Sequence, residues 1–173
     1  EAARRAVSPG EADLLGWRPF PGVSIPGRTN WRVVRKLGEG GFGEAWLVEQ
    51  PKSKRKSVYK FCFDPTHLAS LKREVTLLRA LNDNPAAEGR IAKVLDWSMD
   101  TPPHFLELQY YEEGSLVTYV ETIGGMIKLT LIRRMEFLAQ ISEALSIAHQ
   151  QGILHRDVKP SNILIENDKN GKP

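Results

Sequence analysis

The sequence predicts an α+β fold built from two lobes, and three observations support this. Short β-prone segments separated by glycine-rich or polar turns fill the region from 31 to 110, with one capped helix among them. From 115 onward, apolar residues recur at helical spacing. The first 29 residues alternate proline with glycine, which breaks regular structure. We therefore expect an arm or linker over 1–29, a strand-rich lobe over 30–111 and a helical lobe over 112–173.

Five strands are expected in the strand-rich lobe, over 31–37, 44–49, 56–63, 91–97 and 105–110. A helix separates the third strand from the fourth. It begins at Asp64-Pro65-Thr66, which supplies a cap and a proline suited to a first helical turn. Four leucines and Val75 then recur at spacings of three or four, and the helix ends over 82–85.

The helical lobe is expected to begin with a short helix over 115–122 and a long helix over 129–150. The long helix carries an apolar stripe that we expect to face the core, made of Ile132, Met135, Leu138, Ile141, Leu145 and Ala148. A polar turn over 155–162 and a short strand over 163–165 follow.

Composition excludes several classes of protein. The 173 residues include 24 Lys and Arg against 21 Asp and Glu, and 41% are apolar, which is typical of a globular protein. Cys62 is the single cysteine, so an internal disulfide is excluded. No apolar segment reaches the roughly 18–20 residues that span a membrane, and no signal peptide is recognisable. We expect a cytoplasmic protein, with no membrane segment in this chain.

The formal net charge of +3 predicts little about partners. The densest basic cluster lies between two expected strands, where a solvated hairpin turn is the simplest interpretation; it contains Lys52, Lys54, Arg55 and Lys56. We therefore expect no nucleic-acid partner.

A glycine-rich segment lies between the first two expected strands. Gly38, Gly40 and Gly43 have the G-x-G-x-x-G spacing that lets backbone amides approach phosphate oxygens. A strand follows instead of a helix, so the motif favours a hairpin lid over a nucleotide and not a dinucleotide-binding turn. There is no GxxxxGK[ST] motif to support a Walker-type site. A glycine hairpin without a ligand is the alternative for this motif alone.

Lys60 lies inside an expected strand between Tyr59 and Phe61, where a lysine needs a partner for its ammonium group. Glu74, fourteen residues later, lies near the inward face of the expected helix. A pair between them could hold the lysine against phosphate oxygens. The alternative is a surface lysine and an ordinary helix glutamate.

The strongest motif is the run His155-Arg156-Asp157-Val158-Lys159-Pro160-Ser161-Asn162. Asp157 can accept a hydrogen bond from a hydroxyl nucleophile, and Lys159 can reach a transferring phosphate. Asn162 offers an amide oxygen that suits Mg²⁺. A loop between a helix and a strand can hold these groups rigidly, as phosphoryl transfer requires.

These motifs, in this order, resemble the signature set of the eukaryotic-type (Hanks-type) protein kinases from about Trp31 to the end of the chain. Lys159 within H-R-D-x-K-P-x-N is similar to the serine/threonine branch. The resemblance implies a protein-kinase-like two-lobe fold that binds ATP and Mg²⁺ between its lobes. It also implies transfer of the γ-phosphoryl group to a Ser or Thr hydroxyl of a protein substrate.

By this resemblance, Lys60, Glu74, Asp157 and Lys159 are catalytic, with Asp157 as the base, and Asn162 binds the metal. The ATP-binding set it implies is Leu37, Gly38, Glu39, Gly40, Gly41, Phe42, Gly43, Ala45, Val58, Lys60, Leu108, Gln109, Tyr111 and Leu164. Ala45 stands where the family usually has valine, and Val58 stands where it usually has alanine. We expect these two differences to alter nucleotide affinity more than catalytic competence.

The family's D-F-G motif does not occur before Pro173. We therefore expect a piece of a longer protein with an incomplete metal site, marginally stable and nearly inactive by itself. Two alternatives to a protein kinase are a pseudokinase that binds nucleotide without transfer and a small-molecule phosphotransferase. The intact catalytic residues argue against the first, and the glycine loop together with H-R-D-x-K-P argues against the second.

Overall fold

The computed structural model describes residues 16–40 and 43–167. The chain divides into two compact units. One comprises residues 1–76 and 94–109, and the other comprises residues 77–93 and 110–173. The predicted boundary near 111 therefore differs from the structure at residues 77–93, which belong to the helical unit. The reason is that the turn η2 (Pro85–Ala87), with Ala87 buried, packs against the long helix α4 (Leu131–Gln150).

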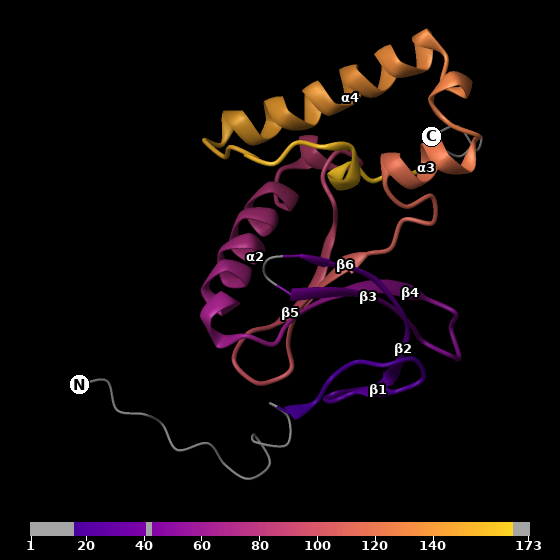
Figure 1. The fold of residues 1–173 in the computed structure, drawn as a ribbon. Coiled ribbons are helices and arrows are strands. Elements are labelled where there is room, and N and C mark those ends of the chain that lie inside the picture. Colours follow the sequence, from indigo (N-terminus) through magenta and orange to yellow (C-terminus); the bar gives the residue numbers. More distant parts are fainter. Residues whose placement is uncertain (1–15, 41–42, 168–173) are drawn as a thin grey trace. The chain divides into compact units, whose positions relative to one another are not determined.

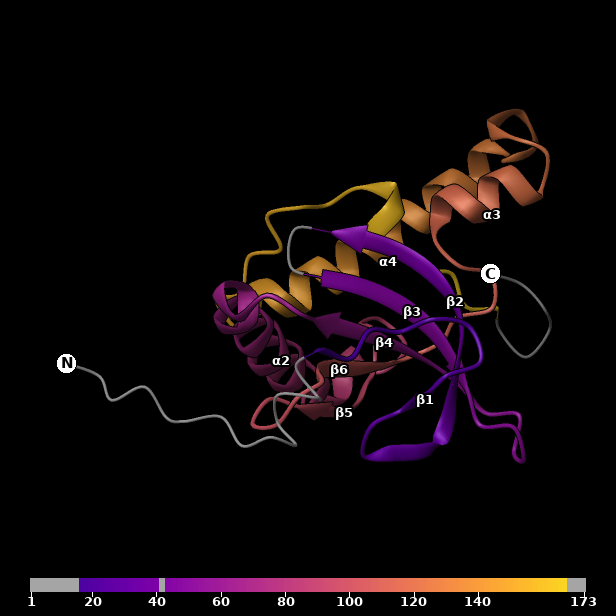
Figure 2. The ribbon, with the colours of Figure 1, turned by 60° about the horizontal axis from the view of Figure 1, so that its bottom comes forward.

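The first unit contains a curled antiparallel sheet (Figures 1 and 2). Its described strands are arranged in the order β1-β2-β3-β4-β6-β5. Their bounds are Ser24–Ile25 (β1), Arg28–Gly40 (β2), Gly43–Glu49 (β3), Lys56–Cys62 (β4), Val94–Ser98 (β5) and His104–Gln109 (β6). The five predicted strands are confirmed, and β1 is an additional one that the sequence pattern did not reveal.

The expected arm over 1–29 is wrong for its described part. Strand β1 pairs with β2, and Ile25 is fully buried. The Trp17 ring meets Phe61 edge-on at 5.2 Å between centroids, and the Arg18 guanidinium lies 4.5 Å from the centre of the Phe63 ring. In the described part of this region, Gly22 and Gly27 lie in tight turns, and Trp17 and Val23 pack against the aromatic core while Phe20 stays exposed. Residues 1–15 lie outside the described part of the chain.

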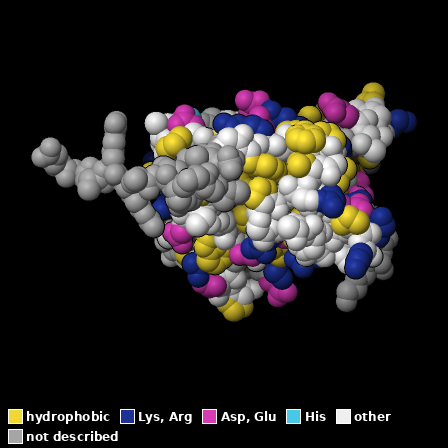
Figure 3. Space-filling view, turned by 90° about the horizontal axis from the view of Figure 1, so that it is seen from below, with side chains coloured by type: hydrophobic (Ala, Val, Ile, Leu, Met, Phe, Trp, Pro, Cys, Tyr) yellow, Lys and Arg dark blue, Asp and Glu magenta, His cyan; other side chains and the backbone are white. Residues whose placement is uncertain are grey.

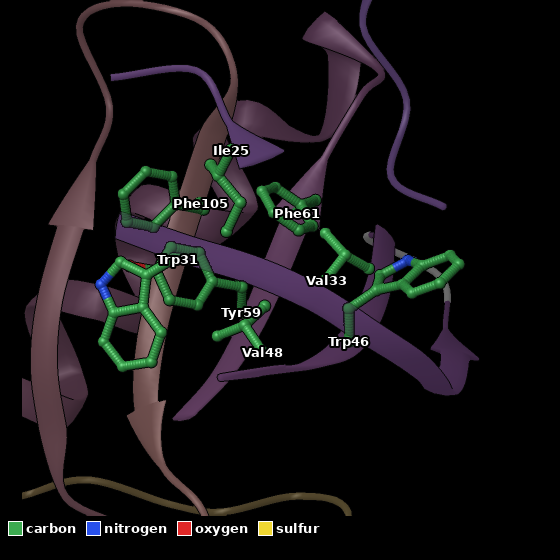
Figure 4. Packing of buried hydrophobic residues seen from close by; sticks show 8 residues of the cluster. All are labelled: Ile25, Trp31, Val33, Trp46, Val48, Tyr59, Phe61 and Phe105. Carbon is green, nitrogen blue, oxygen red and sulfur yellow. The ribbon is translucent and has the colours of Figure 1, made fainter. Parts of the chain in front are cut away.

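An apolar core lies on one face of the sheet (Figure 4). Strand β4 alternates, with Ser57, Tyr59 and Phe61 buried while the residues between them stay partly exposed. Tyr59 and Phe105 stack at 4.6 Å between ring centroids. The core consists of Ile25, Trp31, Val33, Trp46, Val48, Tyr59, Phe61 and Phe105. Because of this alternation, Lys60 lies on the opposite face.

The predicted helix after the third strand is confirmed as a short 3₁₀ turn, η1 (Pro65–His67), followed by α2 (Leu68–Asn82). Asp64 caps it, since its Oδ1 accepts hydrogen bonds from the Thr66 amide at 2.8 Å and the Thr66 hydroxyl at 2.7 Å. Leu71 and Val75 are buried, so the helix is fixed by its apolar side.

The second unit has its own small core. Leu129, Phe137 and Ile165 are buried together, and Tyr119 meets Phe137 edge-on at 6.0 Å. Its remaining elements are α3 (Leu116–Thr122), η3 (Met126–Lys128) and η4 (Pro160–Asn162). The two predicted helices are confirmed as α3 and α4. Among the described residues, no helix is long and apolar enough to span a bilayer.

Two predictions for this unit are wrong. The stripe on α4 does not face the core along its first half, where Ile132 and Met135 are 75% and 59% exposed. Phe137 is buried instead, because its ring packs against Tyr119 of α3. The strand predicted over 163–165 is only an isolated bridge between Leu164 and Ser115.

Candidate active site

The glycine-rich segment forms the hairpin between β2 and β3, as its spacing predicted. Gly38 lies opposite Ala45, and Gly40 lies opposite Gly43. Gly43 has φ of 148°, and a Cβ there would meet the Phe61 carbonyl oxygen at 1.8 Å, so only glycine fits. Gly38 and Gly40 differ, since a Cβ on either would meet nothing within 4 Å among the residues that the structure describes. Packing against the described residues therefore does not explain why these two positions are glycine. Gly41 and Phe42 lie outside the described residues.

Strand register brings several predicted nucleotide-binding residues to the sheet face opposite the aromatic core. Ala45 lies directly opposite Lys60, and Val58 lies opposite Leu108. Side chains at paired positions of neighbouring strands share a face. This face therefore carries Ala45, Val58, Lys60 and Leu108 together.

Lys60 and Glu74 form the predicted ion pair. The Lys60 Nζ lies 2.8 Å from Glu74 Oε1 and 2.6 Å from Oε2, so both carboxylate oxygens accept from one ammonium. The two side chains are 26% and 30% exposed. The pair is therefore accessible to a ligand, while strand β4 and helix α2 hold its two ends.

The catalytic-loop motif forms a compact hydrogen-bonded cluster in the second unit. The Asn162 Nδ2 donates to the backbone oxygen of Asp157 and to its Oδ2, both at 2.9 Å. The Lys159 Nζ lies 2.8 Å from the same Oδ2. Hydrogen bonds from Lys159 and then Asn162 lower the pKa of the Asp157 carboxyl. The loop therefore presents an ionised, exposed carboxylate whose orientation is fixed.

Backbone geometry supports the same cluster. Arg156 has φ of 61°, a left-handed conformation that is uncommon for a residue other than glycine and that concentrates at functional sites. The loop begins after Gly152, which has φ of 70° and ends α4. It is tied down at its far end, where the Ile165 amide donates to the Gly114 carbonyl at 2.9 Å. Nothing in the sequence indicated the strained backbone at Arg156.

The donor set suits a weakly held hard cation. Asn162 uses its amide nitrogen for Asp157, so its amide oxygen is the atom left for a metal. Within the described residues, no group of three or more His, Cys, Asp or Glu side chains is arranged to hold a metal. An amide oxygen such as that of Asn162 is a kind of ligand that Mg²⁺ takes together with phosphates and water.

The remaining described residues of the predicted ATP-binding set lie on β2, on β6 and in the second unit. Gln109 ends β6, and Leu37 lies on β2 near the hairpin. Tyr111 belongs to the second unit, where burial raises the pKa of its hydroxyl. Leu164 forms the bridge to Ser115. The carboxylate of Glu39, a residue predicted to contact nucleotide, lies 2.7 Å from Lys36 Nζ.

One feature of the second unit was not predicted. A cavity of about 300 Å³ lies beside the catalytic loop. His155, Lys159 and Asn162 line it from the loop, and Leu81 and Ile141 line it from α2 and α4. The sequence could not reveal it, because these side chains come from segments far apart in the chain.

The chain is similar in sequence to a known protein family. The family model described as "Protein kinase domain" matches residues 31–172. The chain belongs to the protein kinase family. The match includes both the glycine-rich hairpin and the Asp157 loop, which lie in separate units of the structure.

Curated relatives agree with this kinase assignment. The chain is 33% identical over 147 residues to the serine/threonine-protein kinase pkn2 of Myxococcus xanthus, covering 82% of this chain and 17% of that protein. It is 32% identical over 143 residues to the serine/threonine-protein kinase PknH of Mycobacterium bovis, covering 80% of this chain and 23% of that protein. The chain thus spans about a fifth of the length of these relatives.

A solved structure confirms the kinase fold. The crystal structure of a kinase domain superposes with a TM-score of 0.69 at 21% identity, covering 87% of this chain and 43% of the other. At this identity the similarity supports the fold alone. The predicted protein-kinase-like α+β fold is therefore confirmed.

Proposed function

We propose that this chain is the nucleotide-binding and catalytic-loop part of a protein serine/threonine kinase. The reaction is transfer of the γ-phosphoryl group of ATP to a Ser or Thr hydroxyl of a protein substrate. The observation that carries the proposal is the Asp157 carboxylate, fixed by Lys159 and Asn162 on an exposed loop. The similarity to the serine/threonine-protein kinases pkn2 and PknH supports the same activity.

The first unit supplies the phosphate-binding groups. Backbone amides around Gly38 and Gly40 would bind phosphate oxygens, and the open space beside both glycines supports this role. The Lys60 ammonium, held by Glu74, adds a fixed positive charge for the α- and β-phosphates. Glu74 prevents the flexible lysine side chain from turning to solvent, so less ordering is needed when nucleotide binds.

The second unit supplies the groups that act on the acceptor. Asp157 accepts a hydrogen bond from the substrate hydroxyl and aims the oxygen at the γ-phosphorus. A new O–P bond forms while the bond to the β,γ-bridging oxygen breaks, and ADP leaves. The hydroxyl proton passes to Asp157 and then to water. Because the pKa of Asp157 is lowered, it takes the proton late, when the O–P bond is largely formed.

Lys159 lies 2.8 Å from the Asp157 carboxylate, and its ammonium would offset charge on the transferring phosphoryl group. Asn162 would hold Mg²⁺ through its amide oxygen. The ion would supply positive charge that neutralises the phosphate oxygens. We propose Leu37, Gly38, Glu39, Gly40, Gly41, Phe42, Gly43, Ala45, Val58, Leu108, Gln109, Tyr111 and Leu164 as the rest of the ATP-binding set.

We also propose a protein partner and not a nucleic acid. On the face of the molecule seen in Figure 3, Lys and Arg side chains are interspersed with Asp and Glu side chains. Nucleic-acid binders gather basic residues into a patch or stripe, which this face lacks among its described residues. We further propose a cytoplasmic location, where the thiol of Cys62 stays reduced.

The test is the Asp157→Asn variant of the complete gene product, assayed for phosphate transfer from ATP to a mixture of proteins. We expect a loss of about 100-fold or more, because the variant cannot accept the hydroxyl proton. ATP affinity should stay close to that of the unsubstituted protein. The matched control is Asp100→Asn, which removes an exposed carboxylate from the turn between β5 and β6.

Unchanged transfer in Asp157→Asn would contradict the proposal. Transfer to small molecules alone would indicate a small-molecule phosphotransferase. ATP binding without any transfer by the unsubstituted protein would indicate a pseudokinase.

A further inference from the structure

A group of charged side chains flanks the glycine-rich hairpin on the sheet face opposite Lys60. The Lys36 Nζ lies 2.7 Å from Glu39 Oε2 and 2.8 Å from Glu44 Oε1. Lys36 and Glu39 lie on β2, and Glu44 lies on β3. One ammonium therefore joins the two strands just below the turn.

An irregularity in strand pairing makes this arrangement possible. Lys36 lies opposite Trp46 and Gly38 lies opposite Ala45, so β2 has one extra residue, Leu37, between those two pairs. In a regular strand, side chains three residues apart point to opposite faces. The extra residue reverses the alternation and brings Lys36 and Glu39 to the same face. Glu44 joins them there, because it lies opposite Glu39.

That face is the one that carries the aromatic core. Trp46 lies opposite Tyr59 and belongs to the core cluster, whereas Ala45 lies opposite Lys60 on the other face. Glu44 shares the face of Trp46, two residues along β3. Lys36 and Glu44 therefore cannot touch a nucleotide bound on the Lys60 face, and any effect they have on nucleotide must act through the hairpin.

The carboxylate of Glu44 is fixed from two sides. Its Oε2 accepts a hydrogen bond from the Trp46 indole nitrogen at 2.8 Å, while its Oε1 faces Lys36. Burial alone would raise the pKa of Glu44, but the hydrogen bonds from Lys36 and Trp46, with the nearby charge of Arg18, lower it overall. Glu44 is therefore an ionised anchor attached to the buried Trp46.

We propose that Lys36 and Glu44 are positioning residues that hold the glycine-rich hairpin in the conformation that receives the nucleotide phosphates. The inference rests on the proposed function, since it concerns the affinity of that site for ATP. The hairpin backbone at Gly38 and Gly40 has no side chains to stiffen it. A cross-strand ionic contact anchored on Trp46 lowers the conformational freedom lost when phosphates bind.

The test measures the dissociation constant for ATP in the presence of Mg²⁺, by calorimetry at low and high salt. Lys36→Met and Glu44→Gln should each weaken affinity about 3-fold at low salt, the range of an exposed ionic contact. Glu44→Gln keeps an oxygen for the Trp46 indole, so it removes the charge alone. Lys36→Arg should restore affinity, because arginine can also bridge two carboxylates. At high salt the differences should shrink, since ions screen exposed charges.

The matched control is Lys54→Met, which removes an exposed ion pair with Glu49 at the other end of β3. It should bind ATP as the unsubstituted chain does. Amide hydrogen exchange of the free chain supplies a second measurement that needs no nucleotide. Lys36→Met should speed exchange over the described amides of 36–47 and leave the rest of the sheet unchanged.

Equal ATP affinity in all variants, or a loss that Lys36→Arg does not restore, would overturn the positioning role. Absence of ATP binding by the unsubstituted chain would instead overturn the proposed function, and with it this role. If the unsubstituted chain does not bind ATP but Lys36→Met exchanges its amides faster, the contact between Lys36 and Glu44 stabilises the hairpin without a role in nucleotide binding.

Discussion

Ser57, Tyr59 and Glu107 show how single side chains set the direction of Lys60. Glu107 is only 3% exposed, and its two oxygens accept from the Ser57 hydroxyl and the Tyr59 hydroxyl, each at 2.9 Å. A buried carboxylate requires such partners. The contacts join β4 to β6 on the core face, so Lys60, the residue after Tyr59, is directed to the opposite face.

Removing the hydroxyl of Tyr59 leaves one oxygen of Glu107 buried without its donor. We predict that Tyr59→Phe lowers the free energy of unfolding by about 1–3 kcal/mol, measured by urea denaturation. Tyr119→Phe, which keeps the ring packing against Phe137 in the other unit, is the control. A Tyr59→Phe variant as stable as the unsubstituted chain would contradict the network.

The environment of Tyr59 also predicts that the stability of the fold depends on pH. Burial, followed by the charge of Glu107, raises the pKa of Tyr59 above its usual value. The folded state therefore keeps the proton that the unfolded state loses, and stability is lost as pH rises above about 10. Tm measured from pH 8 to 11 should fall more steeply for the unsubstituted chain than for Tyr59→Phe. Parallel curves of Tm against pH for the two proteins would contradict a raised pKa of Tyr59.

Residue pairs could be predicted where chemistry demanded a partner. Lys60 needed an anion within a strand, and Glu74 lay on the inward side of a capped helix, so their pairing followed from pattern. Lys36 and Glu44 could not be found in this way, because their contact depends on the extra residue Leu37 in β2. No sequence period indicates such an irregularity.

At the scale of elements, helix α4 shows how a correct helix can be assigned the wrong face. Its apolar residues have helical spacing, but the stripe of Ile132, Met135 and Leu138 is mostly exposed. The spacing defines a helix and an apolar side. The spacing cannot predict that Phe137, just beside the stripe, packs against the ring of Tyr119 on α3.

This difference can be tested by paired substitutions. We predict that Phe137→Ala lowers the free energy of unfolding by about 3–5 kcal/mol, because it leaves a cavity beside Tyr119. Ile132→Ala should change it by about 0.5 kcal/mol or less, as is usual for an exposed site. Chemical denaturation of both variants supplies the comparison. A larger loss of unfolding free energy in Ile132→Ala than in Phe137→Ala would show that the apolar stripe, and not Phe137, faces the core.

Strand β1 is another element that pattern could not reveal. Its two residues are too few for an alternation, and the surrounding prolines and glycines indicated an arm. Ile25 becomes fully buried only because β1 pairs with β2 and closes over the aromatic core. Tertiary packing therefore decided the structure here, against local propensity.

At the scale of the whole molecule, the proposed function assigns different groups to the two units. The first unit has the glycine-rich hairpin and the Lys60–Glu74 pair, and the second has the Asp157 cluster. The order of these motifs along the chain sufficed to predict the kinase fold, because each motif is a local feature. Their detailed contacts depended on strand register and on backbone conformation such as that of Arg156.

The most direct test of the account is calorimetric titration of the chain with ATP and Mg²⁺, comparing the unsubstituted protein with Lys60→Met. We predict saturable binding by the unsubstituted protein and affinity weaker by about 10-fold or more in the variant, which loses a charged phosphate contact. Lys72→Met, on the exposed side of α2, should bind normally. Equal affinity in Lys60→Met, or no binding by the unsubstituted protein, would contradict the account.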